Sequence, residues 1–193
     1  MHSAFLSNQY LLKRQVFSFT GTFRVYDKTN DQLVLFSQQK MFKLKEDIRI
    51  FSDETRSQEI LRINARNIID FSAAYDVFDS STQTLVGTLR RKGMRSIIRD
   101  MWEVLNPEGQ IIGILQEDDQ TLALVRRLIA GSLIPQNYDL VSDGYRLVDL
   151  KQRFNPFRYD LDIDFTDTST LIFDRRLGIA AGILLAAIEG RQD

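Results

Sequence analysis

The sequence predicts a mainly β protein: a closed antiparallel β-barrel of about twelve strands that encloses a hydrophobic C-terminal α-helix. Residues 177–188 read LGIAAGILLAAI and contain no polar side chain. A helix that is apolar on every side must be buried on every side. This stretch would span roughly 18 Å, which is too short to cross a bilayer. Because the chain before it reads mostly as strands, the simplest container is a sheet curled around the helix.

The strand prediction comes from a hairpin pattern that repeats along the chain. Each copy has an alternating apolar strand, a turn with Asp or Asn, and a second short apolar strand, which is the signature of a β-hairpin. The central residues of the first strands are 25, 27 and 27 positions apart, so the hairpins are copies of one unit. These central residues are Val25, Ile50, Val77 and Val104.

A fifth copy, 138–141 with 145–148, is displaced by a segment that we interpret as an amphipathic helix at 119–132. Apolar residues recur there at spacings of three and four, with Arg126 and Arg127 opposite, and Pro135 stops the helix. Adding strands near Tyr10 and at 159–165 gives about twelve strands, a number that can close and leave no free edge.

The C-terminal helix is predicted over 174–188, with Asp174 as its N-cap. Arg175 and Arg176 in the first turn oppose the helix dipole, which is compatible with another role, such as pairing with acidic groups at the mouth of the barrel. Gly178 and Gly182 form a G-x-x-x-G pair. We interpret it as packing against large strand side chains, in preference to a dimerisation face in lipid.

Length and composition favour one domain over 1–193, and they exclude several classes of function. The 193-residue chain has a net charge of −1, which argues against a nucleic-acid-binding protein, and it has no cysteine, which excludes disulfides and thiolate sites. We find no pattern typical of a signal peptide or of a transmembrane segment. We therefore expect a cytoplasmic protein, peripheral at the membrane where it meets lipid.

Two segments together with the hairpin repeat resemble a known group of proteins. The segments are LVGTLRRKGMRSIIRDMWEVLNPEGQIIGILQED and FDRRLGIAAGILLAAIEG. They are similar to the tubby C-terminal-like superfamily, which includes the plant LURP-one-related proteins and the phospholipid scramblases, and they look most like its bacterial LURP-one-like members. The resemblance implies a twelve-stranded barrel threaded by the C-terminal helix, and association with lipid. It implies no catalytic motif.

The residues needed for common catalytic and metal sites are missing. The only histidine is His2, and neither a P-loop nor a G-x-G-x-x-G motif occurs. We therefore expect no enzyme activity, no cofactor and no metal. Asp160, Asp162 and Asp164 match the start of a calcium loop, but Phe165 stands where that loop needs Gly. Their alternation with apolar residues favours a strand with the aspartates outside and solvated.

One basic run is the main functional signal. It consists of five cations within ten residues and contains no acid. Because the net charge of the whole chain is −1, the residues outside this run have a net charge of −6. It is either a solvated turn balanced by acids such as Asp100 and Glu103, or a site for anionic headgroups or phosphates, because arginine binds phosphate through paired donors. The candidate site residues are Arg90, Arg91, Lys92, Arg95 and Arg99.

From this run we predict a non-enzymatic binding module for an anionic membrane lipid or a membrane-linked protein partner. Two alternatives stay open: a carrier of an apolar ligand inside the barrel, and an activity like that of phospholipid scramblases.

Overall fold

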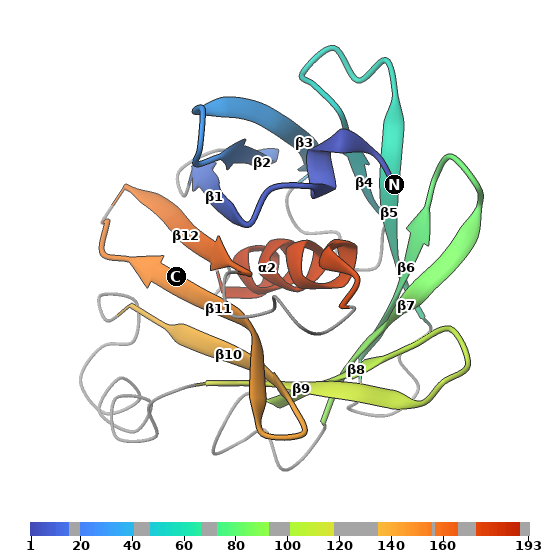
Figure 1. Ribbon diagram of the computed structural model, residues 1–193. Helices are drawn as coiled ribbons and strands as arrows, with labels where there is room; N and C mark the ends of the chain where they lie inside the picture. The colour runs from blue at the N-terminus through green and yellow to red at the C-terminus, as the bar shows by residue number, and fades with distance from the viewer. Residues whose placement is uncertain are drawn as a thin grey trace.

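The computed structural model describes residues 1–15, 20–40, 47–66, 73–92, 101–117, 135–155, 157–165 and 173–189. In these residues, antiparallel strands pair edge to edge into a closed barrel. Each strand lies beside its neighbours in the sequence, and β1 pairs with β12 to close the ring (Figure 1). The predicted closed antiparallel barrel of twelve strands is therefore confirmed.

The strands follow the predicted hairpins closely. A short 3-10 turn at Ser3–Phe5 precedes the first strand. The strands are β1 (Gln9–Gln15), β2 (Thr20–Asp27), β3 (Gln32–Lys40), β4 (Ile48–Phe51), β5 (Glu59–Ala65), β6 (Ala74–Asp79), β7 (Thr84–Arg91), β8 (Met101–Leu105), β9 (Ile111–Glu117), β10 (Asn137–Ser142), β11 (Tyr145–Arg153) and β12 (Arg158–Asp164).

Aspartate side chains explain the polar position that recurs in the hairpin repeat. The Asp27 Oδ1 accepts the backbone N–H of Thr29 at 2.8 Å, and the Asp79 Oδ1 accepts the backbone N–H of Ser81 at 2.9 Å. Such a contact mimics a backbone turn and holds the chain in its reversal. The repeat thus places a side-chain acceptor where the chain has to turn.

Helix α2 (Arg175–Glu189) is buried along most of its length, since residues 177–187 all lie out of solvent. Figure 1 shows α2 in the middle of the ring of strands. Its glycines allow close approach: a Cβ on Gly178 would lie 2.6 Å from the Phe165 ring, and one on Gly182 would lie 2.8 Å from the Ile163 side chain. Close packing, as expected from the sequence, accounts for both glycines.

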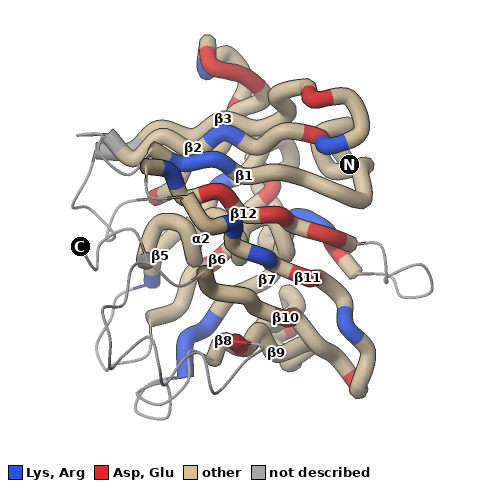
Figure 2. The backbone as a smooth tube through the Cα atoms, turned by 90° about the vertical axis from the view of Figure 1, so that its left-hand side faces the viewer, with Lys and Arg blue, Asp and Glu red and all other residues tan. Residues whose placement is uncertain are grey.

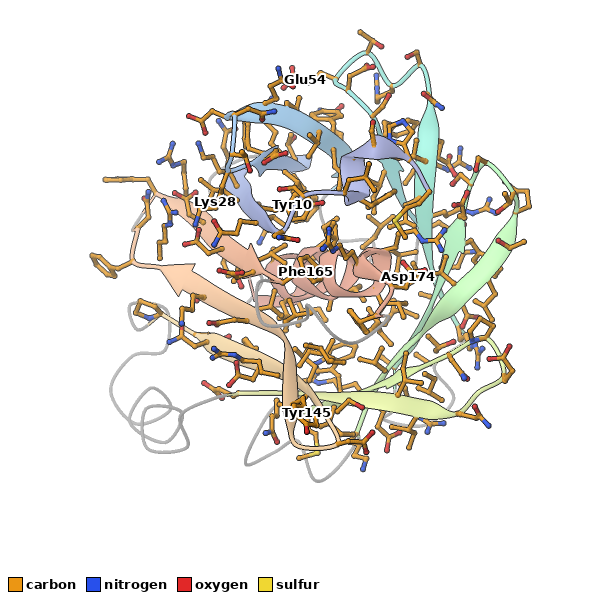
Figure 3. The ribbon with its side chains drawn as sticks, in the orientation of Figure 1. Tyr10, Lys28, Glu54, Tyr145, Phe165 and Asp174 are labelled. Carbon is orange, nitrogen blue, oxygen red and sulfur yellow. The ribbon has the colours of Figure 1, made fainter. Side chains whose placement is uncertain are left out.

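The start of α2 is held by contacts at one end of the barrel. The Asp174 Oδ1 accepts the backbone N–H of Arg176 at 3.0 Å, as expected of an N-cap (Figure 3). Arg176 also donates to the Asp79 Oδ2 at 2.6 Å. Arg175 donates to the backbone carbonyl of Leu6 at 2.6 Å. These contacts offset the unfavourable placing of two cations near the positive end of the helix dipole.

The antiparallel pairing gives the barrel two different ends. Because neighbouring strands run in opposite directions, the odd-numbered strands finish at one end and the even-numbered strands at the other. Three even-numbered strands finish at Asp27, Asp79 and Asp164, and we call their end the aspartate end. The odd-numbered strands β7 and β11 finish at Arg91 and Arg153, and we call theirs the basic end.

Two parts of the sequence prediction fall outside the described residues. They are the amphipathic helix expected at 119–132 and the last two members of the basic run, Arg95 and Arg99. In the described part of the chain, α2 is the one α-helix, and it spans Arg175–Glu189 where 174–188 was predicted.

Candidate anion-binding site

The basic run begins where β7 ends, at the basic end of the barrel. In the pairing of β7 with β8, Arg90 lies opposite Glu103 and Arg91 lies opposite Trp102. Side chains alternate between the two faces of a strand. Trp102 belongs to the buried core, as the sequence indicates, so Arg91 faces inward and Arg90 faces outward. The run is therefore divided between the two faces of the sheet.

Glu103 binds the two outward cations. Arg90 donates through Nε at 2.9 Å and Nη2 at 2.6 Å to the Glu103 Oε2, and the Lys92 Nζ lies 2.8 Å from the Glu103 Oε1. The Glu103 side chain is buried, at 8% exposed, whereas those of Arg90 and Lys92 are 44% and 38% exposed. The carboxylate thus lies beneath two cations that reach solvent.

The ionisation of Glu103 reflects these neighbours. Burial raises the pKa of its carboxyl, but the hydrogen bonds and positive charges of Lys92 and Arg90 outweigh burial, and the net effect lowers the pKa. The carboxylate is therefore ionised at neutral pH and balances one of the nearby cations.

The inward member of the run has a different environment. The guanidinium carbon of Arg91 lies 6.0 Å from the centre of the Trp102 ring, within the range of a cation–π contact. The half-buried Arg91 thus covers the tryptophan at the basic end. Taken together, Arg90, Arg91, Lys92 and Glu103 have a net charge of +2.

This arrangement can bind an anion without losing its internal ion pairs. Arginine has five N–H donors and lysine has three, so Arg90 and Lys92 can contact Glu103 and an external oxyanion together. A phosphate or carboxylate would meet two partly exposed cations at this point, and it would compete with Glu103 for their charge.

The acidic strand β12 differs in one respect from the sequence prediction. Leu161 and Ile163 are buried, as expected. The aspartates, however, are not simply solvated: Asp160 is only 5% exposed, and Asp162 accepts from Arg153 at 2.6 and 2.7 Å. Strands β1 and β11 flank β12 because the barrel closes on both of its sides (Figure 2). The cation Arg153 comes from β11, and Arg158, which lies 3.4 Å from Asp160, comes from β12 itself.

These pairs leave β12 poorly suited to a metal ion. Asp162 is also bound by Lys28, whose Nζ lies 2.9 Å from its Oδ1. Burial raises the pKa of Asp162, but the hydrogen bonds and charges of Arg153 and Lys28 outweigh it and lower the pKa. Within the described ranges, no group of three or more His, Asp or Glu side chains could hold a metal ion.

Sequence reasoning missed one buried cation near the basic end of the barrel. The Arg14 Nη1 donates to the backbone carbonyl of Ala186 at 2.7 Å, and Arg14 is only 3% exposed. The signal was present, because Tyr10, Leu12 and Arg14 alternate along β1 and so share its inner face. Arg14 thus satisfies one of the carbonyls at the C-terminal end of α2.

None of the helices in the described residues is both long enough and apolar enough to span a membrane.

Comparison with known proteins gives one finding. A search of curated proteins and a search of solved structures each found no match. The model of the LURP-one-related family matches residues 33–178, which is more than half of the chain. The chain therefore belongs to the LURP-one-related family.

Proposed function

We propose that this protein is a non-enzymatic binding module that associates with anionic lipid headgroups through the basic run at the end of β7. The observation that supports the proposal is the cluster in which Arg90 and Lys92, both partly exposed, share the single buried carboxylate of Glu103. Two cations on one carboxylate leave positive charge at the surface, and that charge can bind phosphate groups.

The expected strength is modest. Each basic residue near an anionic membrane contributes about 1 kcal/mol, and the attraction falls off over about 8 Å at physiological salt. Arg90 and Lys92 together would contribute about 2 kcal/mol, which suits reversible association. We also propose that the protein is cytoplasmic and associates with the membrane peripherally.

We also propose that the protein is a tubby-like barrel threaded by α2, as the family resemblance implies. The helix would then fill the centre of the barrel, and the close approach of Gly178 to Phe165 and of Gly182 to Ile163 supports that arrangement. A filled centre favours binding at the surface over a carrier of an apolar ligand. A scramblase-like activity would be tested separately, by the exchange of fluorescent lipid between the two leaflets of vesicles.

The first test compares two variants that lose the same number of positive charges. Arg90→Gln/Lys92→Gln changes the basic run, and Lys28→Gln/Arg146→Gln changes two cations at or near the aspartate end. In co-sedimentation with phosphatidylserine vesicles at low salt, the first variant should partition roughly thirtyfold less than the wild type, which corresponds to about 2 kcal/mol. The control should partition like the wild type, and neutral phosphatidylcholine vesicles should bind none of the three. Equal partition of the two variants would contradict the proposal.

The second test strengthens the site. Glu103→Gln keeps the shape of the side chain and an oxygen acceptor, but it removes the negative charge that competes with a lipid phosphate. We expect this variant to bind phosphatidylserine vesicles several-fold more tightly at low salt, and high salt should remove the difference. Weaker or unchanged binding would mean that the cluster is only a structural ion pair. If this protein binds neutral vesicles only when those vesicles carry a second protein, a membrane-linked protein partner is favoured instead.

A further inference from the structure

The tip of the β11–β12 hairpin exposes two aromatic rings. Phe154 is 64% exposed and Phe157 is 71% exposed, and they are the exposed phenylalanines of the described residues. The hairpin lies at the left-hand edge of the ribbon in Figure 1, on the outside of the barrel. Leaving two such rings in water forgoes burial of apolar surface, which stabilises a protein by about 25 cal/mol per Å².

The tip is held in a defined conformation. The Asn155 Oδ1 accepts the backbone N–H of Phe157 at 2.9 Å and that of Arg158 at 3.1 Å. One side chain thus closes the turn between β11 and β12, as the aspartates do at the other end of the barrel. The two rings are therefore presented by a closed turn on a paired hairpin.

Cations lie directly behind the rings. Residues 151–159 contain Lys151, Arg153 and Arg158 and no acidic residue. Arg153 is oriented by Asp162, with contacts of 2.6 and 2.7 Å, and Arg158 lies 3.4 Å from Asp160. Apolar rings at a tip with arginines behind them match the layers of a bilayer surface, where acyl chains lie below charged headgroups.

The tip is on the same side of the barrel as the basic run. Strands β7 and β11 are both odd-numbered, so Arg91 and Arg153 finish their strands at the same end. Four strand spacings separate these strands, or about 19 Å along the sheet. A flat, extended, negatively charged surface can meet both places at once.

We propose that the hairpin tip inserts Phe154 and Phe157 into the interfacial layer of an anionic bilayer and so docks the barrel on the membrane by its basic end. The inference rests on the proposed function, because it takes the surface met by the basic run to be a membrane. A membrane is favoured over a protein because the apolar tip and the basic run are separate, lie at the same end of the barrel and can meet one extended anionic surface together. The basic run supplies the salt-sensitive part of binding, and the rings supply a part that salt does not screen.

The chain has no cysteine, so a single label can be placed at will. F157C carries a polarity-sensitive nitrobenzoxadiazole label at the tip. Y145C carries the same label at the aspartate end, where the exposed Tyr145 begins β11 (Figure 3). With vesicles of phosphatidylserine and phosphatidylcholine, we expect the F157C label to shift to the blue and to be quenched by brominated acyl chains. The Y145C label should show neither change.

A second pair of variants measures the contribution of the rings. F154S/F157S should reduce partition into the same vesicles by roughly ten- to hundredfold, and the reduction should persist at high salt. Y145S, which removes an equally exposed ring from the other end, should leave partition unchanged. Unfolding curves like that of the wild type would establish that the variants are folded.

The outcomes separate the two proposals. If the wild type sediments with phosphatidylserine vesicles but the F157C label stays as in water, the insertion is wrong and the proposed function stands. A shift of the Y145C label in place of the F157C label would also overturn the insertion. If the wild type does not bind these vesicles even at low salt, both proposals fail. Full binding by F154S/F157S would overturn the insertion and leave the rings to a protein partner.

Discussion

Single aspartate side chains at the turns make the stability of the protein depend on pH. Burial raises the pKa of Asp79, but hydrogen bonds from Ser81 and Thr82 and the charge of Arg176 outweigh it, so the net effect lowers the pKa. A carboxyl whose pKa is lower in the folded than in the unfolded chain stabilises the fold above its unfolded pKa. That contribution is lost as the pH falls through the folded pKa.

We therefore expect the free energy of unfolding to decrease as the pH is lowered from about 5 to about 2. Asp79→Asn should be less stable at pH 7 and should show a shallower decrease, because one of the responsible carboxylates is gone. Urea unfolding at a series of pH values measures both. Asp31→Asn removes a charge from the same end and serves as the control. An Asp79→Asn variant with the wild-type pH profile would contradict this explanation.

Glycine residues on α2 offer a second prediction at the scale of single atoms. Alanine is the better helix former by about 1 kcal/mol, yet Gly178→Ala should destabilise the protein, because its Cβ would lie 2.6 Å from the rigid Phe165 ring. Overpacking of this kind costs about 1–3 kcal/mol. Gly182→Ala should be better tolerated, since its Cβ would meet the flexible end of Ile163 at 2.8 Å.

Thermal and urea unfolding of the two glycine variants would rank them. A more stable Gly178→Ala protein, or a Gly182→Ala protein that is the worse of the two, would mean that α2 is less closely packed against Phe165 than the structure indicates.

Helix α2 has a cation at its C-terminal end that comes from the first strand. A helix leaves its last carbonyl groups unpaired and carries a partial negative charge there. Arg14 meets both needs, because it donates to the carbonyl of Ala186 at 2.7 Å from a buried position. The contact ties together segments that are 172 residues apart in the chain.

Arg14→Met keeps an unbranched apolar stem but removes the charged donor. We expect it to destabilise the protein by about 1.5–3 kcal/mol, the usual contribution of a hydrogen bond to a charged group, because the buried carbonyl of Ala186 loses this partner. Arg14→Lys should recover part of the loss. Urea unfolding gives the comparison, and wild-type stability of Arg14→Met would show that relief from burying the charge balances the lost bond.

The strands were predictable from the sequence because each hairpin has local signals. Alternating apolar residues and an Asp or Asn at the turn lie within a few positions of one another. The C-terminal helix was predictable because its apolar run has no polar interruption. The sequence indicated Glu103 as an acid that could balance the basic run, but not that it would pair with Arg90 and Lys92 in particular, because that depends on the register of β7 against β8. The pairing of Asp162 was missed for a related reason: Arg153 and Lys28 reach it from other parts of the chain.

The whole molecule has an uneven distribution of charge. Aspartates finish three even-numbered strands at one end, and arginines finish β7 and β11 at the other. A charged surface would therefore orient the barrel as well as attract it, because the two ends respond in opposite ways. Exposed pairs elsewhere, such as Arg24 with Glu54, contribute little to this asymmetry since their charges cancel.

The acidic side chains of the barrel lead to a prediction about metals. A metal that binds only the folded protein must raise its melting temperature. Because Asp162 is already bound by Arg153 and Lys28, we expect millimolar calcium and a chelator to leave the melting temperature unchanged. Differential scanning fluorimetry is sufficient to test this. A rise with calcium that disappears in Asp162→Asn would mean that the carboxylate can exchange its cations for a metal.

The pairing of β1 with β12 has a consequence for how the protein is made. The first strand cannot pair with β12 until residue 164 has left the ribosome, and α2 cannot take its buried position until residue 189 has followed. Contacts between segments so far apart in the chain make folding slow, on the order of milliseconds to seconds. During synthesis the hairpins can form one after another, but their inner faces and the open edge of β1 stay exposed to water. A nascent chain in that state is a natural substrate for chaperones that shield apolar surface until translation has passed α2.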